Sequence, residues 1–144
     1  MPETVAVAAD HAGYDLKCLL LPRLRELGFE VLDLGTHSRD SVDYPDFAGA
    51  VADALRDGRA KRGVLLCGTG IGMSMAANRH RHVRAALCHD ATAARLARQH
   101  NDANVLVLGG RLIGAETARD CLETFLATPA EEGARHARRL AKLA

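Results

Sequence analysis

Residues 64–72 combine a cysteine with three alternating glycines, in the run VLLCGTGIG. The run reads as a buried strand that ends at Cys67 and opens through glycines onto a helix. Such a turn presents backbone N–H groups and the positive end of a helix dipole to an anion. The start of a helix also favours the thiolate, which is the reactive form of cysteine. The run therefore predicts an anion-binding turn beside a candidate base or nucleophile.

The glycine pattern does not match the common nucleotide-binding loops. A dinucleotide fingerprint would need glycine where the chain has Met73, and no Lys-Ser or Lys-Thr pair follows as in a Walker loop. Backbone contact with an oxyanion or a phosphate remains open, and a tight turn without a ligand is the alternative. Cys67 is the functional candidate among the cysteines because of its place at the strand end. The other three read as small buried hydrophobic residues: Cys18, Cys88 and Cys121.

Two further pairs of polar residues follow apolar segments. Asp10-His11 ends the first apolar run, where the carboxylate could orient a hydroxyl-bearing ligand while the imidazole meets a phosphate. An Asp helix cap beside a surface His is the alternative. His100-Asn101 offers an acid that works near neutral pH and an amide donor for an oxyanion. Taken alone, this second pair favours a polar turn that ends a helix.

Three arginines could hold a phosphate. Arg111 follows two glycines at a strand end, and Arg135 and Arg139 are spaced four apart, which places them on one helix face. The guanidinium fork suits a phosphate dianion. A solvated basic helix face is the alternative for the last two.

Alternating apolar and helical patterns must position these groups. Strands are expected over 5–9, 30–34, 64–67, 83–88 and 105–108, and helices over 16–27, 45–58, 72–78, 91–99, 115–126 and 131–143. Pro22 lies inside the first helix and predicts a kink or a break there. The alternation predicts an α/β fold, a three-layer αβα sandwich around a five-stranded parallel, doubly wound (Rossmann-like) sheet. In such a sheet ligands bind outside the carboxyl ends of the strands, where the polar and glycine residues gather.

Composition limits the function classes. The chain has 144 residues, 48% apolar and 26% charged, with a net charge of +1, which predicts one domain over 1–144. The near-neutral balance and an aromatic content of 3% argue against nucleic acid as a partner. No apolar run has the length of a membrane span and no signal peptide is recognisable, so no membrane partner and a cytoplasmic location are expected. The widely spaced cysteines predict free thiols, with neither a disulfide framework nor a metal site.

Together, these segments resemble type B ribose-5-phosphate isomerase and the related galactose-6-phosphate isomerase subunits. The similarity covers nearly the whole chain and keeps the motif order of the family. Each motif alone is weak, and the set is specific. The segments that carry the resemblance are Asp10-His11-Ala12-Gly13, Asp43-Tyr44-Pro45, Cys67 to Gly72, Arg98-Gln99-His100-Asn101-Asp102 and Arg135-His136.

The resemblance implies an aldose–ketose isomerase of the pentose phosphate pathway that works through an enediolate without metal or organic cofactor. Cys67 would be the base, and Thr69 and His100 would open the sugar ring. One family branch uses a carboxylate elsewhere in place of the thiol, and Cys67 with Ser74 matches the thiol branch. The remaining site residues are implied in three groups: Asp10 and Tyr44 for the sugar; Asn101 and the backbone N–H groups of Gly68, Gly70, Ile71 and Gly72 for the enediolate oxygens; His11, Arg111, Arg135 and Arg139 for the phosphate.

The resemblance also implies an active site shared between two subunits, in a homodimer or a homotetramer. The basic helix 131–143 would then pack at a subunit interface. The expected substrate is D-ribose 5-phosphate, interconverted with D-ribulose 5-phosphate. The alternatives are another aldose phosphate (allose 6-phosphate, galactose 6-phosphate or a tetrose 4-phosphate) or a non-catalytic subunit that binds a sugar phosphate. A nucleotide-binding domain is disfavoured by Met73.

Overall fold

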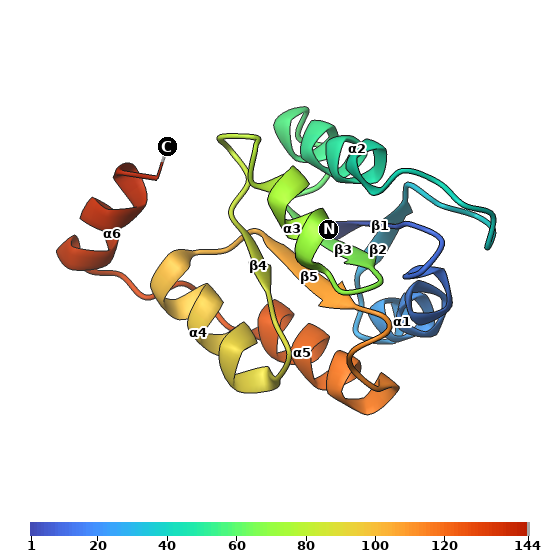
Figure 1. Ribbon diagram of the computed structural model, residues 1–144. Helices are drawn as coiled ribbons and strands as arrows, with labels where there is room; N and C mark the ends of the chain where they lie inside the picture. The colour runs from blue at the N-terminus through green and yellow to red at the C-terminus, as the bar shows by residue number, and fades with distance from the viewer. Residues whose placement is uncertain (144) are drawn as a thin grey trace.

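The computed structural model describes residues 1–143, and its centre is a parallel sheet (Figure 1). The strand order is β2-β1-β3-β5-β4, and every neighbouring pair is parallel. Each predicted strand is present within those residues, and the predicted fold class is confirmed. The strands are β1 (Thr4–Ala9), β2 (Glu30–Asp33), β3 (Arg62–Cys67), β4 (Ala85–Leu87) and β5 (Val105–Gly109).

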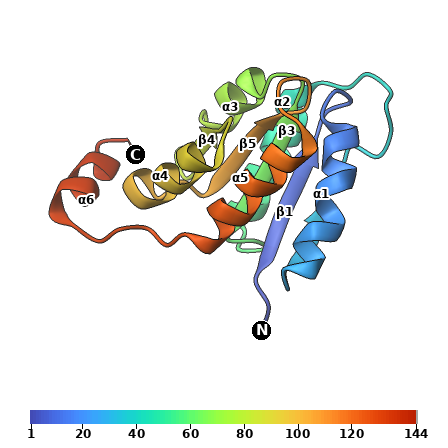
Figure 2. The same cartoon turned by 90° about the horizontal axis from the view of Figure 1, so that it is seen from below.

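Helices cover both faces of the sheet, as Figures 1 and 2 show. Alternate residues of the buried strands face opposite layers, so Val5 and Val7 join one core and Ala6 and Ala8 the other. The first core includes residues of α1, α4 and α5, and the second includes residues of α2 and α3. The helices are α1 (Tyr14–Glu26), α2 (Tyr44–Arg56), α3 (Ile71–Ala77), α4 (Ala91–Asn101), α5 (Ala115–Ala127) and α6 (Ala134–Ala141).

Three differences from the expected elements have local causes. Helix α1 continues through Pro22, which is exposed, so water can bond the carbonyl that loses its helical donor. Strand β4 is shorter than 83–88 because the N–H of Arg84 donates to the side chain of Asn104, 2.7 Å away. The C-terminal helix begins at Ala134 rather than 131, because the N–H of Glu131 donates to the carbonyl of Gln99 at 3.0 Å and ties this segment to α4.

Within residues 1–143, no helix combines the length and the apolar character that spanning a membrane requires. Helix α6 lies beyond the end of the sheet, where it contacts α4 (Figure 2). Every residue of α6 keeps some solvent exposure. Its placement leaves the arginines of its surface accessible.

Two thiols of the first core should make the fold less stable at alkaline pH. Cys88 and Cys121 are almost fully buried, and burial raises the pKa of Cys88 to about 12 and of Cys121 to about 11, from an ordinary value of 9.0. Above about pH 9 the unfolded chain loses thiol protons that the folded chain keeps. The free energy of unfolding should therefore fall by up to about 1.4 kcal/mol per pH unit for each thiol. Denaturant titrations between about pH 8 and about pH 10.5 measure the slope, and Cys121→Ala should make it shallower. Equal slopes in the two proteins would contradict the assignment.

Candidate active site

The order in which the chain adds strands reverses at β1, so the carboxyl ends of β1 and β3 form a topological switch point. The chain leaves β1 for β2 on one side and returns for β3 on the other. Open α/β sheets bind ligands at such a switch point. Asp10 follows β1 and Cys67 ends β3, and the N–H of Asp10 donates to the carbonyl of Leu66 at 3.1 Å. Asp10 and Cys67 therefore both lie at this switch point, as the sequence predicts.

The sulfur of Cys67 accepts a hydrogen bond from the backbone of the glycine turn. The N–H of Gly70 lies 3.1 Å from Sγ. Gly70 has a φ of +81°, and a Cβ there would lie 2.4 Å from Cδ1 of Leu87, so only glycine fits. A donated hydrogen bond stabilises negative charge on sulfur, which suits a thiol that acts as a base.

The expected oxyanion donors are only partly available. Besides the N–H of Gly70, the N–H of Ile71 is engaged, since it donates to Oγ1 of Thr69 at 3.2 Å. An oxyanion bound by these two groups would replace their contacts with Thr69 and Cys67. The turn is thus organised around its own side chains.

Two side chains from other elements lie over the turn. Tyr44, from the first turn of α2, covers Gly72: a Cβ on that glycine would lie 2.6 Å from Cζ of the ring. Arg111 lies beside Gly68: a Cβ added to this glycine would lie 3.3 Å from the guanidinium Nη1. The backbone N–H of Arg111 also donates to the carbonyl of Gly68 at 2.8 Å. The structure therefore brings Tyr44 and Arg111 to the turn, as the resemblance implies.

Asp10 and His11 are partly occupied by backbone contacts. Oδ1 of Asp10 accepts the N–H groups of Ala12 and Gly13, both at 3.0 Å, and so holds the turn that precedes α1. The N-cap of α1 is Gly13, so the alternative of a helix-capping aspartate is wrong. Nδ1 of His11 accepts the N–H of Val42 at 3.2 Å, which ties the loop before α2 to the site. Because Nδ1 accepts, the proton of a neutral His11 is on Nε2, where it can be donated to a ligand.

A buried lysine, which the sequence pattern does not indicate, holds the loop that follows β2. Nζ of Lys17 lies 2.7 Å from Oδ1 of Asp33 and 2.7 Å from the carbonyl of Thr36, and the side chain is 1% exposed. A charge so deeply buried requires such partners. The leucines around Lys17 recur at helical spacing and do not indicate that the lysine is buried, because its burial depends on the loop after β2.

The other predicted site residues lie at the opposite end of the sheet. Helix α4 starts after the carboxyl end of β4 and returns along the sheet for 11 residues, about 16 Å. His100 and Asn101 occupy its last turn, and Arg135 and Arg139 lie on α6 beside it (Figure 1). One chain therefore carries two separate half-sites, one around Cys67 and one around His100.

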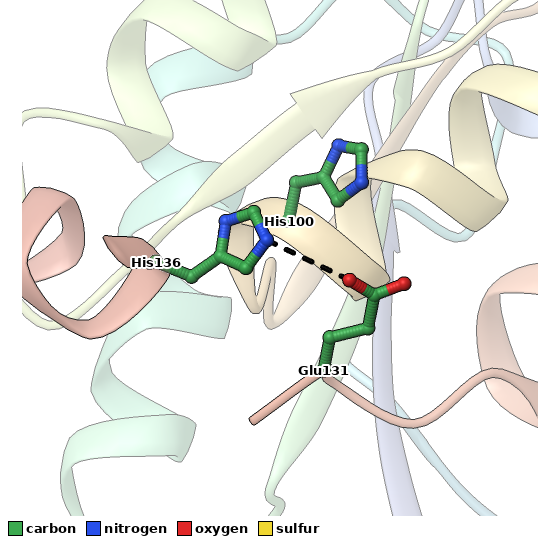
Figure 3. A group of neighbouring side chains, drawn as sticks. All are labelled: His100, Glu131 and His136. Atoms are coloured by element: carbon green, nitrogen blue, oxygen red, sulfur yellow. Dashed lines mark ion pairs between the residues drawn. The ribbon is translucent and has the colours of Figure 1, made fainter. Parts of the chain in front are cut away.

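Two residues to which the sequence assigned no role in the reaction lie beside His100. The rings of His100 and His136 stack with their centroids 5.0 Å apart and their planes inclined by 11° (Figure 3). Nε2 of His136 lies 3.6 Å from Oε2 of Glu131. The position of His136 next to Arg135 in the basic tail was the one available signal.

A doubly wound sheet with a hydrogen-bonded thiol and polar side chains at its switch point defines an enzyme of small-molecule chemistry. Residues 5–143 match the model of the family described as Ribose/Galactose Isomerase, and the chain belongs to that family. It is an isomerase, as the resemblance implies.

Individual relatives align with this chain over most of their length. The chain is 43% identical over 136 residues to ribose-5-phosphate isomerase B of Escherichia coli, covering 94% of this chain and 91% of the relative. It is 41% identical over 131 residues to D-erythrulose-4-phosphate isomerase of Pectobacterium atrosepticum, covering 90% and 86%. A crystal structure of ribose 5-phosphate isomerase from Thermotoga maritima superposes with a TM-score of 0.95 at 53% identity, covering 98% of this chain and 97% of that one.

Proposed function

We propose that this isomerase interconverts D-ribose 5-phosphate and D-ribulose 5-phosphate through an enediolate, with Cys67 as the base. The observation that carries the proposal is the buried thiol at the switch point, whose sulfur accepts the N–H of Gly70. The relatives from Escherichia coli and Thermotoga maritima are named for ribose 5-phosphate. A proton beside a carbonyl is weakly acidic, so its removal requires a base held close to the substrate.

The proposed reaction begins when Thr69 and His100 assist opening of the sugar ring. Cys67 then takes the proton from C2 of the open aldose and returns it to C1, while the proton of the C2 hydroxyl moves to the oxygen on C1, so that the carbonyl shifts from C1 to C2. Between these steps negative charge develops on the two oxygens, which Asn101 and the backbone N–H groups of Gly68, Gly70, Ile71 and Gly72 stabilise. Such donors are strongest in a site that excludes water. Oδ2 of Asp10 and the hydroxyl of Tyr44 would hold the sugar.

This reaction requires a second copy of the chain. Cys67 and His100 lie at opposite ends of the sheet, so the partner's α4 and α6 would complete the site around each thiol. A cavity of about 480 Å³ next to Asn101 is lined partly by Leu140 and exposed Leu143, which offers apolar surface for a neighbouring subunit. We propose a homodimer, alone or paired into a homotetramer, with the basic helix α6 at the subunit interface.

The arginines of α6 are proposed to hold the phosphate, together with Arg111 and Nε2 of His11. Arg135→Ala or Arg139→Ala should therefore raise KM for ribose 5-phosphate about ten- to hundredfold, with a smaller effect on kcat, because a charge-assisted hydrogen bond to phosphate is lost. Steady-state kinetics measure both constants. Arg25→Ala, an exposed change on α1, is the matched control and should leave KM unchanged. An unchanged KM in both α6 variants would contradict the phosphate role.

The substrate is tested with a panel of aldose phosphates of four, five and six carbons, assayed by NMR. Ribose 5-phosphate should give the highest kcat/KM. The similarity to a D-erythrulose-4-phosphate isomerase supports a tetrose 4-phosphate as the second candidate, and allose 6-phosphate and galactose 6-phosphate complete the panel. Binding without turnover of any of them would favour a non-catalytic subunit instead.

A further inference from the structure

We propose that His100, Glu131 and His136 bind one divalent transition-metal ion of the zinc class, and that this ion inhibits the isomerase. One ligand atom from each residue lies within 4.8 Å of the other two (Figure 3). Two imidazoles and a carboxylate form a donor set of three-ligand zinc sites, in which water takes the fourth position. Mg²⁺ and Ca²⁺ prefer oxygen donors and are poorly matched to this set.

The distances are close to those of a tetrahedral site. Zinc bonds of 2.0–2.1 Å place neighbouring ligand atoms about 3.4 Å apart. Nε2 of His136 and Oε2 of Glu131 are already 3.6 Å apart. Binding therefore needs a movement of His100 by on the order of an ångström, and a turn of its ring out of the stack with His136. His100 is exposed at the end of α4, so little packing opposes this change.

The backbone holds the three residues in one place. The N–H of Glu131 donates to the carbonyl of Gln99, the residue before His100, so the carboxylate and this imidazole share a fixed support. The side chain of His136 is only 12% exposed and is presented by α6. The three residues line a cavity of about 260 Å³, which also includes Asp102 and leaves room for an ion with its water.

Inhibition rests on the function proposed for His100, whereas binding does not. An imidazole coordinates a metal through the same nitrogen lone pair that accepts a proton. An ion on His100 would therefore withdraw it from ring opening. The ion would act as an inhibitor, and the reaction itself would require no metal.

Binding is tested by calorimetric titration of the chelator-treated full chain with Zn²⁺. A single ion should bind per chain, and Glu131→Gln should weaken it at least about tenfold, since even outer contacts of a metal site affect affinity to that extent. Glu132→Gln, a neighbouring exposed carboxylate outside the cluster, is the matched control and should bind as the wild type does. Mg²⁺ should give no competing binding.

The free thiols are the main competitors for the metal ion, and Co²⁺ distinguishes binding by a thiol from binding at the proposed site. Cobalt bound by Cys18 or Cys67 would show thiolate-to-metal charge-transfer absorption, whereas the proposed site should not. This absorption at the first equivalent, or equal Zn²⁺ affinity in the wild type and Glu131→Gln, would overturn the assignment. No Zn²⁺ binding in the millimolar range would also overturn it.

Activity supplies a second readout. Zn²⁺ should inhibit turnover of ribose 5-phosphate reversibly, with recovery on addition of EDTA. Glu131→Gln should keep its basal activity and need at least about tenfold more Zn²⁺ for the same inhibition, in line with its weaker binding. Full turnover with the site occupied would overturn the inhibitory role. If the chain turned over no aldose phosphate, the proposed function would fail while the binding experiment would still decide the metal site.

Discussion

Replacing Cys67 by alanine should abolish isomerisation while the sugar phosphate still binds. A positioned general base contributes about 10²–10⁴-fold to a rate, so kcat should fall by at least about a hundredfold. The phosphate and hydroxyl contacts are made by other residues, so KM should change little. Steady-state kinetics and calorimetry with ribose 5-phosphate measure the two effects separately.

The matched control is Cys18→Ala, which should leave kcat unchanged. Cys18 is exposed on α1, so the prediction that it is buried is wrong. Cys67→Ser keeps a hydrogen-bond acceptor for the N–H of Gly70 but offers a much weaker base, so it should resemble the alanine variant. If Cys67→Ala retained more than about a few per cent of wild-type turnover, Cys67 could not be the base.

His100→Asn should slow ribose 5-phosphate turnover about 10²–10⁴-fold, because ring opening loses its acid–base group. Ribose 5-phosphate closes into a ring through the oxygen on C4. In a tetrose 4-phosphate that oxygen carries the phosphate, so the substrate stays open. The variant should therefore lose much less of its activity on erythrose 4-phosphate than on ribose 5-phosphate.

The ratio of the two losses separates ring opening from other roles of His100. Assays of wild type and variant with both substrates provide it. Equal losses on the open-chain and the ring-forming substrate would show that His100 acts after ring opening or only supports the structure.

The fold was largely predictable because each element shows its own pattern. The apolar runs that become β1, β3 and β5 are buried on both faces, and glycines and polar residues follow their carboxyl ends. The errors have tertiary causes. The start of α6 is shifted by the bond from Glu131 to Gln99, and β4 is shortened by the contact between Arg84 and Asn104.

The sequence indicates candidate site residues one by one, but it does not predict how they are arranged in space. The glycine turn is recognisable in the sequence because the strand, the thiol and the glycines are contiguous. The sequence around His100 does not indicate how far this residue lies from Cys67. The separation arises because α4 runs back along the sheet and places His100 at the amino ends of the strands. The cluster of His100, Glu131 and His136 was missed because its members are separated in sequence and meet through the extended segment before α6.

Coexpression of Cys67→Ala and His100→Asn tests whether two chains share each active site. Each variant alone should be inactive. In a mixed dimer one site combines an intact Cys67 with an intact His100 from the partner, and the other site lacks both. A statistical mixture should therefore recover about a quarter of wild-type turnover per chain. A mixture as inactive as the two separate variants would contradict the shared site.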